Sequence, residues 1–179
     1  KLMKNYTNPY VSLAKSAVET YINKKKVIKV PDGLPKEMTS KKAGTFVTIK
    51  KNGDLRGCIG TYLPTKESIA EEIIQNAITA VTEDYRFGLV QKEELPYLAY
   101  SVYILEKPEL VKDTKELNPK KYGIIIKTLN HPLKSALLLP DLSGINTVEQ
   151  QISVTCQKGG IDPSKEKTVI YKFKVKEYS

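Results

Sequence analysis

Apolar residues recur every three to four positions in three stretches of the chain, a spacing typical of amphipathic helices. Each stretch follows residues that favour a helix start, and the three starts are Asn8-Pro9, Pro64-Thr65 and Asn146. Glu149 completes the pattern of a capping box with Asn146, and the glycine pair 159–160 is expected to end that helix. Residues 31–44, with two prolines and little periodicity, are predicted to form a connector.

Runs typical of β-strands fill most of the remaining chain. The runs 45–50 and 54–60 flank Lys51-Asn52-Gly53, and Asn-Gly between two such runs predicts a hairpin. Further strands are expected in "YLAYSVYIL", "YGIIIK", "SALLLP" and "TVIYKFKVK". The order of the elements indicates an α+β fold rather than a regular βαβ succession, and a hairpin followed by a helix occurs in both halves.

The composition is that of an ordinary globular protein, with 40% hydrophobic and 27% charged residues in 179. A chain of this length can bury a core without a disulfide or a metal, and we expect one domain over 1–179, built as a single body or as two closely packed halves. The sequence contains neither a run of membrane-spanning length nor a signal-peptide core. Two cysteines far apart in the sequence favour reduced thiols, so we expect a cytoplasmic protein.

The net charge of +9 allows an interpretation as an RNA-binding module. The lysines are spread along the whole chain, however, and a lysine-rich surface needs no partner. We therefore keep RNA binding as an alternative and do not favour it. One histidine and no C-x-x-C pair give no basis for a zinc site, and no cofactor fingerprint occurs, so neither a metal nor a cofactor is expected.

Only two of the 29 basic residues are arginines, and the first, Arg56, lies in "DLRGCIG" beside Cys58. In a regular strand these two side chains would share one face, where the cation would favour a reactive thiolate. Gly57 and Gly60 inside a strand indicate a bulge or a close approach by a ligand or by other backbone. Two interpretations stay open: a ligand-contacting strand with an activated cysteine, or a buried structural thiol whose neighbouring glycines admit a helix.

The second arginine, Arg86, lies in "TEDYRFG", after the second predicted helix. A guanidinium binds a carboxylate or a phosphate through two parallel hydrogen bonds, which lysine cannot do. The partner of Arg86 is therefore either internal, with Asp84 and Glu83 close in sequence, or an anionic ligand. Cys156, by contrast, shares a helical stripe with apolar residues and is expected in the core.

"LRGCIGT" at 55–61 resembles the signature of the AMMECR domain family, which includes protein A of the AmmeMemoRadiSam system. The similarity extends over nearly the whole chain, through the segments 10–22, 76–87, 93–105, 137–140 and 156–161. The chain departs from the usual family residues at Tyr85, Gly88, Tyr122 and Gly159, which stand in place of proline, proline, histidine and alanine.

The resemblance implies a single AMMECR-type domain over 1–179. Its expected fold is α+β, with two related β-rich halves and flanking helices around one mixed, barrel-like β-sheet. It also implies partners, namely a Memo-like protein and a radical SAM protein. The positions that match the family's marked residues are Leu55, Arg56, Gly57, Cys58, Ile59 and Gly60, with Asp84, Arg86 and Phe87.

Three hypotheses for function follow. The first is a component that binds a small ligand or a partner segment near the LRGCIG strand, with Arg56, Gly57, Gly60, Asp84, Arg86 and Phe87 as the binding residues. The second is an enzyme with Cys58 as the nucleophile, Arg56 as its stabiliser and Asp84 or Glu94 as acid–base help. The third is the lysine-rich RNA-binding module. In the first two, both arginines are expected to approach the same region.

Overall fold

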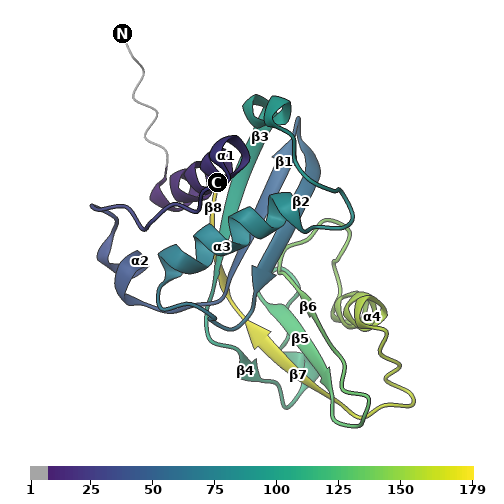
Figure 1. Ribbon diagram of the computed structural model, residues 1–179. Helices are drawn as coiled ribbons and strands as arrows, with labels where there is room; N and C mark the ends of the chain where they lie inside the picture. The colour runs from purple at the N-terminus through teal and green to yellow at the C-terminus, as the bar shows by residue number, and fades with distance from the viewer. Residues whose placement is uncertain (1–7) are drawn as a thin grey trace. The chain divides into compact units, whose positions relative to one another are not determined.

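Figure 1 shows the computed structural model, in which residues 8–179 are described. The chain divides into two compact units. Unit 1 consists of the residues up to 105 together with 176–179, and unit 2 consists of residues 106–175. Every helix within residues 8–179 is too short or too polar to cross a membrane.

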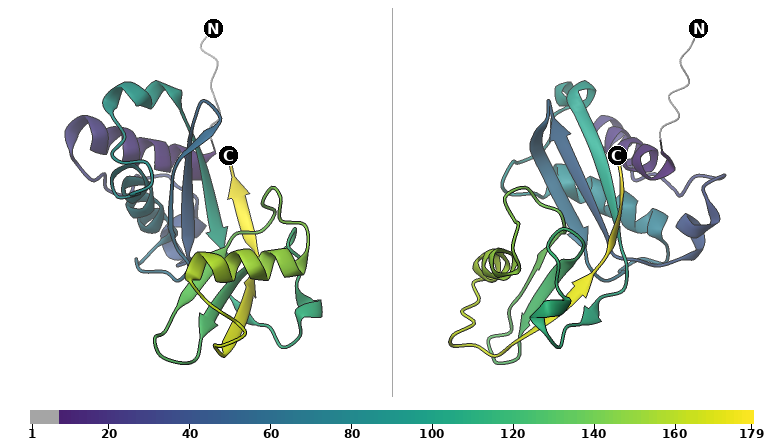
Figure 2. Two further views of the ribbon diagram at one scale, coloured as in Figure 1. Left: turned by 90° about the vertical axis from the view of Figure 1, so that its right-hand side faces the viewer. Right: turned by 180° about the vertical axis from the view of Figure 1, so that it is seen from behind.

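Unit 1 contains a four-stranded antiparallel sheet with the strand order β2-β1-β3-β8. Its strands are β1 (Thr45–Lys51), β2 (Asp54–Thr61), β3 (Leu98–Leu105) and β8 (Val175–Tyr178), and its helices are α1 (Pro9–Lys24), α2 (Lys36–Ser40), α3 (Ile69–Thr82) and the 3-10 helix η1 (Lys92–Tyr97). Helices α1 and α3 pack against each other and against the same face of the sheet (Figures 1 and 2). Their apolar stripes form the core of the unit with Val47, Ile49 and Val102 from the strands.

Unit 2 contains a second antiparallel sheet, with the order β4-β7-β5-β6. Its elements are β4 (Glu109–Leu110), the 3-10 helix η2 (Thr114–Glu116), β5 (Gly123–Thr128), β6 (Ser135–Leu138), α4 (Val148–Gly159) and β7 (Thr168–Phe173). Helix α4 packs on β5 and β6, and Cys156 lies buried in the core between them, with Ile124, Ile126 and Leu138. The prediction of a core position for Cys156 is confirmed.

The two units repeat one arrangement, a hairpin followed by a helix and a third strand. In unit 1 the order in space is β2-β1-β3, and in unit 2 it is β6-β5-β7, so the first strand is central in both. The predicted α+β class is confirmed. The expected barrel-like sheet is not found, because the strands of the described residues form two separate sheets with open edges. The last β-run, expected as one strand, divides at Lys174 between β7 of one sheet and β8 of the other.

Local hydrogen bonds explain where the element boundaries differ from the sequence prediction. Helix α3 begins at Ile69 rather than at Pro64-Thr65, because Ser68 caps it and the buried Glu72 carboxylate accepts the backbone N–H groups of residues 65 and 66. Helix α4 is capped by Thr147 and Gln150, one residue beyond the expected Asn146 and Glu149. Helix α2 is an additional element within the predicted connector.

Candidate functional site

Strand β2 carries a bulge at Arg56, the arginine of the signature. Ile49 pairs with Gly57 and Lys50 pairs with Leu55, so Arg56 is an extra residue in β2. The strict alternation that would put Arg56 and Cys58 on one face therefore does not hold across the bulge. The bulge expected from the glycine-rich sequence is present.

Arg56 binds the segment that follows α3. Its Nε and Nη2 donate to the two carboxylate oxygens of Glu94 at 2.9 and 3.0 Å. Nη1 and Nη2 also donate to the carbonyls of Gly88 and Leu89, each at 3.3 Å. The arginine side chain is only 14% exposed. Its hydrogen bonds, with those from Gln91 N–H and Lys51, lower the pKa of Glu94 to about 2 against the cost of burial.

Arg86 belongs to this segment and reaches back to β2. Its Nε and Nη2 donate to the two oxygens of Asp84 at 3.0 and 2.7 Å, and Nη2 also reaches the carbonyl of Cys58 at 3.4 Å. Asp84 in turn accepts the backbone N–H of Cys58 at 3.0 Å. Its side chain is 2% exposed, and the hydrogen bonds from Arg86 lower its pKa to about 2 although burial raises it. Asp84 thus connects the loop to β2, and of the two alternatives for Arg86 the structure shows the internal partner.

The thiol of Cys58 is half-buried and lies 3.2 Å from the hydroxyl of Thr48 on the neighbouring strand. Asp84 accepts the backbone N–H of this residue. Both cysteines carry thiols rather than a disulfide, as expected. In unit 2, burial raises the pKa of Cys156.

The two glycines of the signature adjoin the protein's own atoms. A side chain at Gly57 would meet the backbone carbonyl of Ala80 in α3, and one at Gly60 would meet the ring of Phe46 in β1. Their close approach is therefore to a helix and to a side chain of unit 1. Gly57 matches the interpretation in which the glycines admit a neighbouring helix, whereas Gly60 admits a side chain of the adjacent strand.

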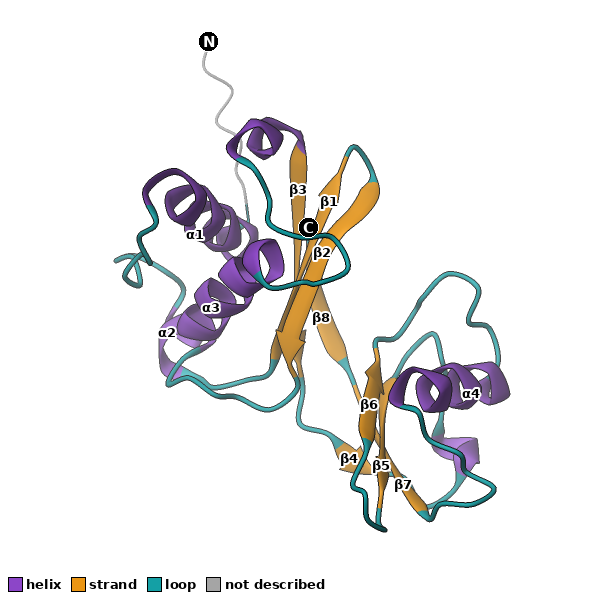
Figure 3. Cartoon of the chain, turned by 45° about the vertical axis from the view of Figure 1, so that its right-hand side comes forward, coloured by secondary structure: helices purple, strands orange, loops and turns teal. Residues whose placement is uncertain are grey.

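The loop between α3 and η1, residues 83–91, crosses in front of β2 (Figure 3). The two arginines and Asp84 attach it to the strand and Val90 is buried, whereas several of its other side chains are exposed. Tyr85 is 93% exposed and Leu89 is 45% exposed. The Arg86 guanidinium lies over the ring of the partly exposed Phe87, 5.1 Å from its centroid. The loop thus holds an apolar surface in a fixed position.

The structure brings the predicted binding residues Arg56, Asp84, Arg86 and Phe87 together with Cys58 at one junction of strand and loop. Gly57 and Gly60 lie on the same strand, but Gly57 faces α3 and Gly60 faces the ring of Phe46. The sequence analysis did not find the exposed residues Tyr85 and Leu89, although their spacing with Phe87 is an alternating apolar pattern inside a polar turn. No cluster among residues 8–179 is placed to hold a metal ion.

The AMMECR1 family model matches residues 11–178. The chain belongs to the AMMECR1 family. A Thermotoga maritima protein is 45% identical over 172 residues, which are 96% of this chain and 97% of that one. Protein CA_C1420 of Clostridium acetobutylicum is 46% identical over 167 residues, which are 93% of this chain but only 35% of its own length.

The fold is also shared with a solved member of similar sequence. The crystal structure of the uncharacterized protein PH0010 from Pyrococcus horikoshii matches with a TM-score of 0.85 and 32% identity, over 94% of this chain and 88% of that one. None of these names states an activity. The AMMECR1 comparison therefore establishes the family and the fold of the chain.

Proposed function

We propose that this AMMECR1-family chain is a non-catalytic component that acts with a Memo-like protein and a radical SAM protein, and that loop 83–91 binds the Memo-like partner. The observation that carries the proposal is that both arginines donate their hydrogen bonds to groups of the protein itself. Arg56 and Arg86 each hold a carboxylate of their own unit and attach the loop to β2. In this proposal the signature residues hold the loop in place, and the loop contacts the Memo-like partner.

The exposed side chains of the loop support a protein partner over a small anion. Tyr85, Phe87 and Leu89 are apolar or aromatic, and aromatic residues are enriched in protein interfaces. A loop that is already fixed loses little conformational entropy on binding. In the Clostridium relative this domain occupies 35% of a longer chain, which supports a function carried out beside another protein segment.

The enzyme hypothesis receives less support from the same geometry. A general base works best when its pKa is near the working pH. Asp84 and Glu94, the acid–base candidates, each have a pKa of about 2 and are engaged by arginine. The single histidine of the chain, His131, belongs to unit 2.

The test is the affinity of the full chain for the Memo-like protein of the same organism, measured by calorimetry. We expect Tyr85→Ser with Leu89→Ser to weaken binding at least about tenfold, because interface anchors often contribute more than about 1 kcal/mol each. Leu129→Ser with Leu133→Ser is the matched control, since both leucines are exposed residues of unit 2. We expect this control to bind like the parent chain.

Two results would overturn the proposal. In the first, the parent chain does not bind the Memo-like protein at all. In the second, the loop variant binds as well as the control while both keep the circular dichroism of the parent.

A further inference from the structure

Three lysines converge on one tyrosine at the start of β5 in unit 2. The ammonium groups of Lys172, Lys121 and Lys174 lie 4.7, 5.2 and 6.0 Å from the centroid of the Tyr122 ring. All four residues belong to unit 2, and this site is separate from the β2 junction on which the proposed function rests.

The backbone around Tyr122 is fixed by hydrogen bonds. Its N–H donates to the carbonyl of Asn118 at 2.8 Å, and its own carbonyl accepts from the buried amide of Gln151 in α4 at 2.8 Å. Lys172 pairs with Ile124 in the β5–β7 register, and Phe173 pairs with Gly123. The fold therefore sets the convergence, because Tyr122 directly precedes β5, while Lys172 lies in the neighbouring strand β7 and Lys174 directly follows it.

A small hollow opens beside this cluster. Its volume is about 110 Å³, and it is lined by Glu106, Lys107, Glu109, Tyr122, Lys172, Phe173 and Lys174. Three lysines and two glutamates are among these residues, so its charge is net positive. Since a water molecule takes about 30 Å³ of the liquid, the hollow has room for roughly three to four waters.

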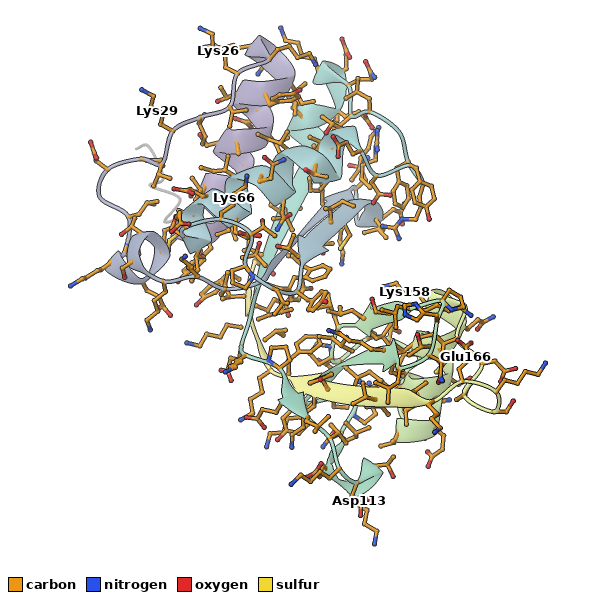
Figure 4. The ribbon with its side chains drawn as sticks, turned by 60° about the horizontal axis from the view of Figure 1, so that its bottom comes forward. Lys26, Lys29, Lys66, Asp113, Lys158 and Glu166 are labelled. Carbon is orange, nitrogen blue, oxygen red and sulfur yellow. The ribbon has the colours of Figure 1, made fainter. Side chains whose placement is uncertain are left out.

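Glu106 and Glu109 line the hollow as counter-charges, but the lysines that line it outnumber them. Within residues 8–179, no ion pair forms at Lys107, Lys121, Lys172 or Lys174. By contrast, Lys134 pairs with Glu166, which is labelled in Figure 4, at 3.0 Å. Ammonium groups that converge on one ring repel one another, and a bound anion would remove that repulsion.

We propose that the Tyr122 hollow binds the phosphate group of a small phosphorylated ligand. A phosphate monoester carries a charge of about −1.5 to −2 at pH 7 and three acceptor oxygens, which matches several ammonium donors. A carboxylate carries only one negative charge. Lysine is a common phosphate ligand as a point charge, and the volume suits the phosphate group with the remainder of the ligand outside.

The test is a titration of the full chain at pH 7.5 and constant ionic strength, followed by the chemical shifts of the backbone amides. With sodium phosphate we expect saturable shifts concentrated at Tyr122, Gly123 and residues 172–174. The double variant K172Q/K174Q should bind about tenfold more weakly, because it removes two of the charge-assisted donors. K112Q/K115Q is the matched control in unit 2, with the same change of charge on exposed lysines.

A comparison of several ligands in the titration distinguishes a phosphorylated metabolite from free phosphate as the ligand of the hollow. Tighter binding of glycerol 3-phosphate than of inorganic phosphate supports a phosphorylated metabolite, and equal binding supports the free ion at the same site. Acetate bound as tightly as phosphate would overturn the proposal. So would a single-stranded RNA that binds more tightly than both phosphates and loses equal affinity in the two double variants, since this indicates a general lysine surface.

Discussion

At the scale of single residues, the two arginines occupy positions where lysine could not make the same contacts. Arg56 binds both oxygens of Glu94 and still donates to two loop carbonyls. Arg86 binds both oxygens of Asp84 and the carbonyl of Cys58. A lysine has three donors on one atom and no planar fork, so it cannot make two parallel hydrogen bonds to the two oxygens of a carboxylate.

The glycine between Arg56 and Cys58 allows a test at this scale. We expect Gly57→Val to lower the free energy of unfolding by about 1–3 kcal/mol, because its side chain would press on the carbonyl of Ala80 in α3. Cys58→Ala removes one small half-buried group and should cost less. Denaturant midpoints of the two variants decide the comparison. Equal losses, or a larger loss for Cys58→Ala, would contradict the close contact between β2 and α3.

At the scale of elements, the sequence predicted the caps and turns that are determined by residues close together in the chain. The cap of α1 by Asn8 is present, with the Tyr10 N–H donating to its side chain at 2.9 Å. The β1–β2 hairpin turns at Asn52-Gly53, where both residues have the positive φ angles that such a turn requires. These features rest on local backbone preferences, which are visible in a few consecutive residues.

The contacts of loop 83–91 could not be predicted in the same way. Arg56 and Glu94 are 38 positions apart in the sequence, and Cys58 and Asp84 are 26 apart. The choice between an internal partner and a ligand for each arginine depends on how β2 and the end of α3 meet in space. Family resemblance identified the residues at this junction, but not the fact that they bind one another.

The low pKa of Glu94, whose carboxylate binds Arg56, predicts that the stability of the protein depends on pH. The pKa of Glu94 is about 2 in the folded protein, below the roughly 4.3 of an unfolded chain. Between these values the unfolded state binds more protons, so the stabilisation present at neutral pH is lost as the pH falls. We expect Glu94→Gln to be less stable than the parent at pH 7, with the difference shrinking towards pH 2.

Urea unfolding at several pH values between 7 and 2 measures this effect. Glu93→Gln is the control, because Glu93 is exposed and forms no ion pair within residues 8–179. A constant gap between Glu94→Gln and the parent over the whole range would show that the carboxylate charge does not hold the loop.

At the scale of the whole molecule, the chain repeats a hairpin, a helix and a strand in two units, and its last residues return to the first unit. Strand β7 completes the pattern in unit 2, and β8 joins the edge of the unit 1 sheet beside β3. The sequence shows one alternating run there, and alternation alone does not say which sheet each part joins. This is why a single strand was predicted where two occur.

Strand β8 is attached to helix α1 by two aromatic rings. Tyr178 in β8 stacks on Tyr10 in α1, with 3.9 Å between the ring centroids and an angle of 6° between the planes. Such a pair contributes about 0.5–1.5 kcal/mol beyond the area that it buries. We therefore expect Tyr178→Ala to lower the free energy of unfolding by at least about 1 kcal/mol. Tyr97→Ala, at an exposed tyrosine of the same unit, should stay within about 0.5 kcal/mol. Guanidinium titrations of the full-length variants measure both values, and similar losses would show that β8 is not needed to hold the core of unit 1 together.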